Sequence, residues 1–403
     1  MAVAVESYVS ARGSTADAVA DLDAQLSRGG GTPHFAFVFY GQCHDDAVID
    51  GFLRARLPGV PLVGGTSCAG VMSDHGLGGA DSVGLLLVHD PDGAYGSAAA
   101  PLGDDASDTA QQTLTRALAS ADAAGELPEL IWVYQSPGQE EAVIAGLRRV
   151  VGDRCPIIGG SSADDDVSGV WRQMGPDGPM RNGVVVGVLF PSGGVGFGFQ
   201  GGYEPTGEHG VVTELGDDTG QGVGRHILTI DDAPAAEVYN GWLGGTLPAD
   251  AMEHGGPILE ATTSTPLAVG AGSVEGVTYY QLIHPEAITP QKGLATFAAV
   301  ERGARVHGMR GNRDHLVTRV GRVVSTAQSS LHVGANDVAG GIVVYCAGCL
   351  LAVGDRAPEV ADTARQSFGD APFLGSFTFG EQGTILDRNL HANLMISAVV
   401  FGR

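Results

Sequence analysis

The chain has 403 residues, more than one hydrophobic core usually holds, so we expect two or three domains. Apolar residues make up 43% of it, which is enough to build packed cores and argues against a disordered chain. Its 46 acidic and 22 basic residues give a net charge of −24. Because such a surface repels phosphate backbones, we exclude DNA and RNA as partners.

The sequence shows neither an export signal nor a membrane span. Residues 1–10 lack the basic-then-apolar pattern of a signal peptide, and no run of eighteen apolar residues occurs. We therefore expect a cytoplasmic protein with no membrane partner. Its five cysteines are an odd number, which favours free thiols over a disulfide framework.

One order of elements occurs three times along the chain. A helix is followed by a buried strand, a second helix, a short apolar strand that ends in a turn, and a hairpin that closes in an apolar strand. In the first copy these elements fall at 16–26, 35–40, 45–57, 60–67 and 82–88. In the second copy they fall at 108–118, 130–135, 139–151, 155–162 and 183–190. In the third copy they fall at 314–324, 341–348, 358–368, 372–380 and 395–401.

This repetition predicts the fold class and the domains. We expect an α/β fold of three helix–strand–helix–strand–hairpin units in mixed sheets, with an inserted α+β segment. The predicted N-terminal region, 1–193, holds the copies at about 14–92 and 107–191. The predicted C-terminal region, 194–403, holds the inserted segment 194–310, with one helix at 233–244, and the third copy at about 312–402.

Segments along nearly the whole chain resemble the landmarks of FIST proteins, which combine a FIST N-terminal and a FIST C-terminal region. The segments are GGTSCAG, GGSSADD, GGYEPTG, LTIDDAPAAEVY, ITPQKGL, VVYCAG, APFLGSFTFGEQG and LHANLMISAVV. The resemblance implies a small-ligand sensory module of bacterial or archaeal signalling. Some family members bind haem and report to a separate histidine kinase, so haem and such a transducer are implied partners, with His391 as the haem ligand.

The turns that end the short strands are the predicted ligand site. Glycines there let backbone N–H groups approach a ligand, and hydroxyls add adaptable hydrogen-bonding groups. Tyrosines end the preceding strands, and their phenols would border the same cavity. Tight turns and buried tyrosines with satisfied hydroxyls are the alternative interpretation. The predicted ligand-binding residues of these segments are Gly65, Thr66, Ser67, Gly160, Ser161, Ser162, Ser376, Tyr40 and Tyr134, with Tyr345 at the third strand.

A polar group in the third copy, made of Glu381, Arg356 and His391, is the second candidate site. Glu381 lies between glycine-flanked aromatic segments, where it would bind a ligand amine or act as a general acid–base, or pair with an arginine. The thiols of Cys68 and Cys43 are the other catalytic candidates, with apolar packing as the alternative.

The sequence therefore favours a sensory protein that binds a small polar metabolite or haem between its repeats and passes the signal to a separate partner. It leaves open an enzyme, a hydrolase or lyase that uses Glu381 or a cysteine thiol, and also an assembly protein. A homodimer is the candidate oligomeric state.

Overall fold

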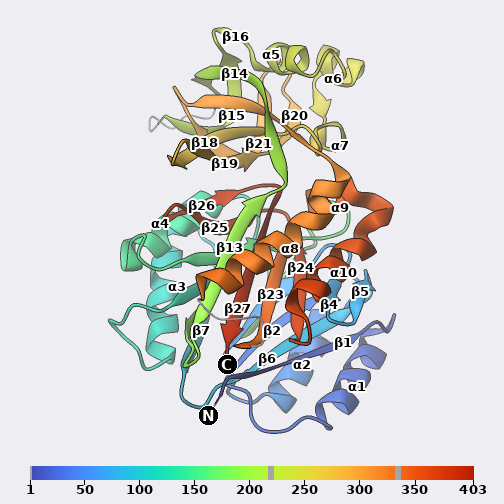
Figure 1. Ribbon diagram of the computed structural model, residues 1–403, viewed down its shortest axis with the longest axis vertical. Coiled ribbons are helices and arrows are strands. Elements are labelled where there is room, and N and C mark those ends of the chain that lie inside the picture. The colour runs from blue at the N-terminus through green and yellow to red at the C-terminus, as the bar shows by residue number, and fades with distance from the viewer. Residues whose placement is uncertain (1, 217–221, 332–336) are drawn as a thin grey trace.

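The structure, a computed structural model, describes residues 2–216, 222–331 and 337–403. It has a lower body of three six-stranded sheets and an upper part built on a nine-stranded sheet (Figure 1). This α/β architecture with mixed sheets confirms the predicted fold class. None of the described helices combines the length and the apolar character that a membrane span requires.

The three sheets of the body share one strand order. The first sheet is β1 (Ala4–Ser10), β6 (Val83–His89), β2 (Phe35–Tyr40), β3 (Leu62–Thr66), β10 (Gln173–Gly175) and β11 (Gly178–Met180). The second is β7 (Ala94–Pro101), β12 (Gly183–Phe190), β8 (Leu130–Gln135), β9 (Ile157–Ser161), β25 (Glu381–Ile385) and β26 (Arg388–Ala392). The third is β13 (Val195–Gly201), β27 (Met395–Gly402), β23 (Val338–Cys346), β24 (Phe373–Thr378), β4 (Val71–Ser73) and β5 (Gly76–Gly79).

Each hairpin leaves its own copy and pairs with the sheet of another copy. The hairpin β10–β11 of the second copy pairs with β3, β25–β26 of the third pairs with β9, and β4–β5 of the first pairs with β24. This exchange closes a ring of three sheets. The turns that precede the hairpins therefore lie where neighbouring sheets meet.

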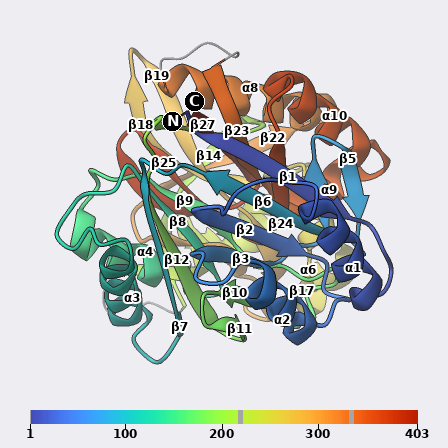
Figure 2. The same ribbon diagram turned by 90° about the horizontal axis from the view of Figure 1, so that it is seen from below.

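Helices cover the outer face of each sheet (Figure 2). They are α1 (Thr15–Leu26) and α2 (Asp46–Arg56), α3 (Ala106–Ser120) and α4 (Glu140–Val151), and α8 (Arg313–Ser330), α9 (Ala347–Val353) and α10 (Ala357–Phe368). The predicted helices are confirmed, and Asp45 caps α2 by accepting hydrogen bonds from two backbone N–H groups of its first turn. The short helix α9 was not predicted and lies between β23 and α10 in the third copy.

The inner faces of the three sheets form one shared core. Phe37 of β2 meets Trp132 of β8 edge to face, with ring centroids 5.1 Å apart, and Ile342 and Val344 of β23 join the same buried cluster. Because all three sheets contribute, no copy can bury its inner face alone.

The upper part carries the nine-stranded sheet and three short helices. In sheet order the strands are β17 (Gly256–Pro257), β20 (Pro285–Ile288), β21 (Leu294–Glu301), β15 (Val223–Ile230), β14 (Tyr203–Leu215), β22 (Arg305–Gly311), β18 (Leu267–Val274) and β19 (Val277–Ile283), with β16 (Ala233–Pro234) beside β15. The helices are α5 (Ala235–Trp242), α6 (Ala249–His254) and α7 (Leu259–Thr262). Since β13 pairs with β27, the first strand of the predicted insert lies in the body; the predicted domain boundaries themselves stay a prediction.

Candidate functional site

The turn hydroxyls of Thr66, Ser67, Ser161 and Ser162 bond within the protein, and that of Ser376 is buried without a hydrogen-bond partner among the described residues. Ser67 donates to the carbonyl of Gly70 at 2.5 Å and accepts from the Phe377 N–H at 2.8 Å. Ser161 donates to the Glu140 carboxylate at 2.8 Å, and the Thr66 hydroxyl accepts from a backbone N–H of the exchanged hairpin. These side chains are buried, and those of Thr66 and Ser67 bond across to neighbouring copies, so they are not directed at a cavity.

The strand register separates the three tyrosines. Tyr40 and Tyr345 face the helices of their own sheets, whereas Tyr134 lies one position earlier in its strand and faces the inner core. Tyr134 donates to the Thr66 carbonyl at 2.7 Å, close to the Ser376 hydroxyl. The expectation that the three phenols border one cavity is therefore wrong, because the sequence pattern aligned tyrosines that differ by one residue in register.

Glu381 has an exact counterpart in the second copy, Gln173, and both connect a turn to the closing strand of a sheet. Gln173 donates to the Ser162 hydroxyl at 2.5 Å and accepts from the Gly183 N–H at 2.9 Å. Glu381 accepts from the Thr378 hydroxyl at 2.8 Å and from the Met395 N–H at 3.1 Å. Burial, and then the neighbouring Cys346, raise the pKa of Glu381 well above its usual range, which favours the protonated form of this carboxyl. In that form the carboxyl can donate one hydrogen bond and accept another, as the amide of its counterpart does.

A pocket of about 370 Å³ lies where the body meets the upper part. The body contributes Cys68 from the first copy, Asp165 and Val167 from the second, and Cys346, Ala347, Gly348, Leu350, Leu351, Gly354, Phe379 and Asn393 from the third. The upper part contributes Leu259, His284 and Phe297. The pocket therefore starts one residue beyond the first predicted turn, and every copy as well as the upper sheet touches it.

The thiols beside the pocket are protonated. Burial, followed by nearby Asp165, raises the pKa of Cys68 to about 12, and burial raises the pKa of Cys346 well above its usual range. A protonated thiol is a weak nucleophile and a poor metal ligand. Cys43, the other catalytic candidate, is exposed, and its thiol donates to the carbonyl of Ala80 at 3.6 Å.

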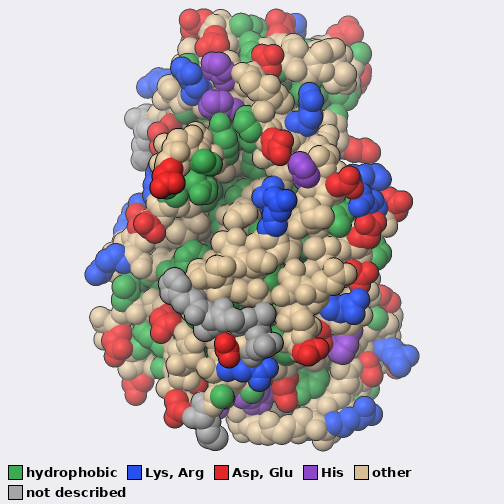
Figure 3. All heavy atoms as spheres, in the orientation of Figure 1, with side chains coloured by type: hydrophobic (Ala, Val, Ile, Leu, Met, Phe, Trp, Pro, Cys, Tyr) green, Lys and Arg blue, Asp and Glu red, His purple; other side chains and the backbone are tan. Residues whose placement is uncertain are grey.

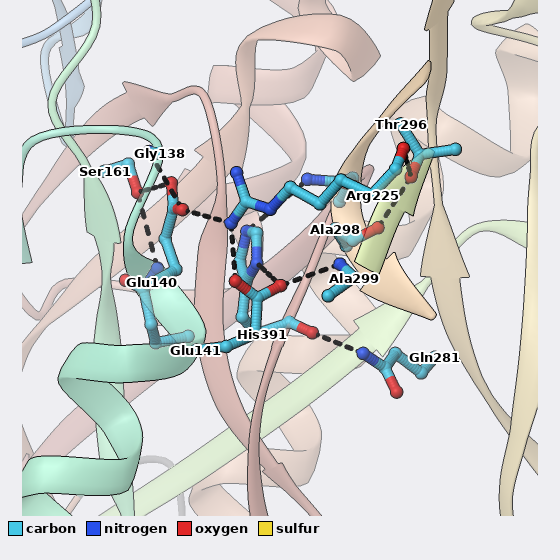
Figure 4. Close-up of polar contacts among 12 residues, drawn as sticks. Gly138, Glu140, Glu141, Ser161, Arg225, Gln281, Thr296, Ala298, Ala299 and His391 are labelled. Atoms are coloured by element: carbon cyan, nitrogen blue, oxygen red, sulfur yellow. Dashed lines mark hydrogen bonds and ion pairs between the residues drawn. The ribbon is translucent and has the colours of Figure 1, made fainter. Parts of the chain in front are cut away.

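Beside the pocket, a chain of polar contacts crosses the seam between the body and the upper part. Asn393 accepts from the backbone N–H of His284 at 3.2 Å, and its amide nitrogen lies 3.5 Å from His391 Nε2. His391 Nδ1 lies 3.1 Å from a carboxylate oxygen of Glu141 (Figure 4). Arg225, from β15 of the upper sheet, donates to Glu141 at 2.5 Å.

This contact chain ends in an ion-pair group at the start of α4 (Figure 4). Arg225 also donates to Glu140 at 2.7 Å, and the Ala299 N–H of β21 donates to Glu141 at 2.8 Å. Burial would raise the pKa of Glu141, but His391 and Arg225 lower it well below its usual range. Candidate metal-ligand atoms of Glu140, Glu141 and His391 lie within 4.8 Å of one another, and the Arg225 guanidinium already supplies the cation there.

The predicted group of Glu381, Arg356 and His391 does not form one site. Arg356 pairs with Asp314 at 2.6 Å and with Glu359 at 2.8 Å near the surface. Sequence reasoning also missed Arg225, His284 and Asn393, since no motif connects segments so far apart in the chain. The Glu140-Glu141 pair at a helix start was the one local signal.

The residues present do not fit haem. His391 is 2% exposed, and both of its ring nitrogens lie beside polar side chains. Haem needs an open axial ligand and carries two anionic propionates, whereas the described residues that line the pocket include no lysine or arginine.

Comparisons with known proteins agree with the sequence resemblance. The model of the FIST N domain matches residues 34–233, and that of the FIST C domain matches residues 235–384. Among solved structures, a cyanuric acid hydrolase from A. caulinodans covers 100% of this chain and 99% of its own, at 13% identity and a TM-score of 0.41. A second cyanuric acid hydrolase structure covers 69% of this chain and 85% of its own, at 10% identity and a TM-score of 0.29. A search of curated proteins gives no significant match.

Proposed function

The chain belongs to the FIST family, whose domains are of the sensory type, and on that premise we propose that it is a sensory protein that binds a small molecule in the pocket between the body and the upper part. The ligand would then lie beside the first Gly-Thr-Ser turn and not on the turn hydroxyls, which are buried. The signal would pass to a separate transducer such as a histidine kinase.

The lining of the pocket is the observation that carries this proposal. Cys68, Asp165 and Cys346 come from the three copies, and His284 comes from the upper part. A ligand in the pocket touches all four units at once, so its binding energy favours one arrangement of these units over others. A sensor needs such a difference in affinity between two arrangements.

The polar contact chain supports a route for the signal. Asn393 lines the pocket and also contacts His391, which in turn contacts Glu141 of the ion-pair group. Arg225 connects that group to the upper sheet. A ligand that displaces Asn393 therefore changes a contact that holds the upper part against the body.

The pocket supports an enzyme less well. A thiol nucleophile requires a thiolate, and burial keeps Cys68 and Cys346 protonated. Glu381, the candidate general acid–base, is fully buried and hydrogen-bonded on both oxygens. Both observations favour binding without turnover.

A thermal-shift screen of small metabolites against the full chain tests the proposal, followed by equilibrium dialysis of each hit. Leu351, half exposed at the mouth of the pocket, is changed to Trp to fill the entrance, and Val277, exposed on β19, is changed to Trp as the matched control. We expect Leu351→Trp to abolish binding, Val277→Trp to leave it unchanged, and the bound compound to be recovered intact. Conversion of the compound would establish the enzyme instead, and binding that survives Leu351→Trp would refute this pocket.

A further inference from the structure

The charge of the pocket restricts its ligand. Among the described lining residues, Asp165 is the one carboxylic acid, and none is a lysine or an arginine. Burial lowers the pKa of His284 to about 4, so its imidazole is neutral, and the two lining thiols are protonated. An anion would enter without a cationic partner and would meet the Asp165 carboxylate, in a protein whose net charge is −24. Acidic side chains also outnumber basic ones on the face drawn in Figure 3.

The shape of the lining separates an apolar interior from one charged edge. Leu259, Phe297, Leu350 and Phe379 line the pocket without offering a hydrogen bond. Asp165 belongs to the segment after β9 and is exposed, so its carboxylate lies at the edge of the pocket beside water. One carboxylate oxygen accepts from the Ala69 N–H at 2.6 Å, which fixes the group in place.

We infer that the pocket takes a small amphipathic monocation, an amine with an apolar body, whose body lies among these apolar side chains and whose ammonium group pairs with Asp165. The inference rests on the proposed function, since it assigns a chemical class to the ligand of that same pocket. It excludes carboxylates and phosphates of the same size. It also excludes free amino acids, because their carboxylate would have no cationic partner there and would lie near the Asp165 carboxylate.

Three probes with one apolar body separate the classes: phenethylamine, 2-phenylethanol and phenylacetate. Titration calorimetry on the full chain should rank the amine first and the alcohol second, with no measurable binding of the acid. The amine should bind more weakly as salt is raised, and the alcohol should not, because salt screens an exposed ion pair and leaves apolar contacts intact.

Variants of the full chain complete the test. Asp165→Asn should weaken phenethylamine binding about two- to fivefold, down to the level of the alcohol, and leave the alcohol unchanged. Asp166→Asn removes an adjacent exposed carboxylate that does not line the pocket and should change neither probe. Leu351→Trp should abolish binding of both.

The outcomes distinguish the two proposals. If phenylacetate binds as well as phenethylamine and Leu351→Trp abolishes both, the pocket stands and the cationic class is wrong. An amine preference that survives Asp165→Asn also overturns the inference. If the probes bind and Leu351→Trp has no effect on their binding, the proposed function fails together with the inference. If no probe binds, the amine class is wrong, and the screen of metabolites still decides the proposed function.

Discussion

Glu381 and Gln173 occupy equivalent places in adjoining sheets, and they differ in that one can ionise. Both side chains are fully buried and connect a turn hydroxyl to the first backbone N–H groups of a closing strand. Burial raises the pKa of Glu381, which is a property expected of a general acid, and the same burial favours its protonated form. At the scale of the residue, it therefore has the role of an amide.

The first prediction follows from that protonation. Below the ordinary glutamate pKa of about 4.3, the folded and unfolded chains both carry the proton, and the stability is complete. As the pH rises above that value, the unfolded chain ionises while the folded chain does not, so stability falls by up to about 1.4 kcal/mol per pH unit until the folded pKa is passed. Glu381→Gln should remove this loss, and urea unfolding at pH 5 and pH 8 measures it.

The reciprocal substitution is the matched control. Gln173→Glu places a carboxyl in the same kind of buried position, so it should lower stability more at pH 8 than at pH 5. If Glu381→Gln instead loses stability equally at both pH values, Glu381 is ionised in the folded protein, and the enzymatic hypothesis regains its general acid–base.

At the scale of the element, the short strands before the turns depend on glycine. Gly159 has φ = +156°, and a Cβ there would overlap the carbonyl oxygen of Val133 on the paired strand β8. Gly64 meets Val38 in the same way in the first copy. Close pairing of these parallel strands is therefore possible with glycine and not with a side chain.

We predict that Gly159→Ala destabilises the protein by more than about 2 kcal/mol, because two backbones must separate. Gly51→Ala, in the helix α2 where no atom lies near the added methyl group, should instead be neutral or gain up to about 1 kcal/mol. Thermal unfolding of both variants checks this, and equal losses would mean that the overlap is relieved by a small shift of β9.

The sequence predicted the order of elements well, because each helix and strand is encoded by its own periodicity. The exchange of hairpins was beyond such reasoning: β25 pairs with β9, more than two hundred residues earlier, and no local pattern specifies that partner. The same limit hid the site. Cys68 was predicted only as a possible thiol nucleophile, and His284 and Asn393 carry no local signal; the three line one pocket because the ring of sheets and the upper part bring them together.

At the scale of the whole molecule, the ion-pair group connects the two parts of the chain. Glu140 and Glu141 belong to the body, and Arg225 approaches from the upper sheet with 22% of its side chain exposed. The pocket lies at the same junction, so a ligand there acts close to the contacts that fix the upper part. Stability and sensing are therefore expected to depend on the same interface.

Arg225→Met tests that dependence. Removing the guanidinium leaves the Glu140 carboxylate, 3% exposed, without its cation. Because Arg225 and Glu141 are partly solvated, we expect the free energy of unfolding to fall by about 2 kcal/mol, which is less than the cost of breaking a fully buried pair. Hydrogen exchange should accelerate at the Ala299 amide, which bonds to Glu141, while the inner strand β8 keeps its protection.

The triple variant Arg225→Met, Glu140→Gln, Glu141→Gln removes the unpaired charges and should recover most of the stability without restoring slow exchange at Ala299. If exchange at β8 accelerates as much as at Ala299, the upper part and the body unfold as one unit, and the seam cannot transmit a signal by itself.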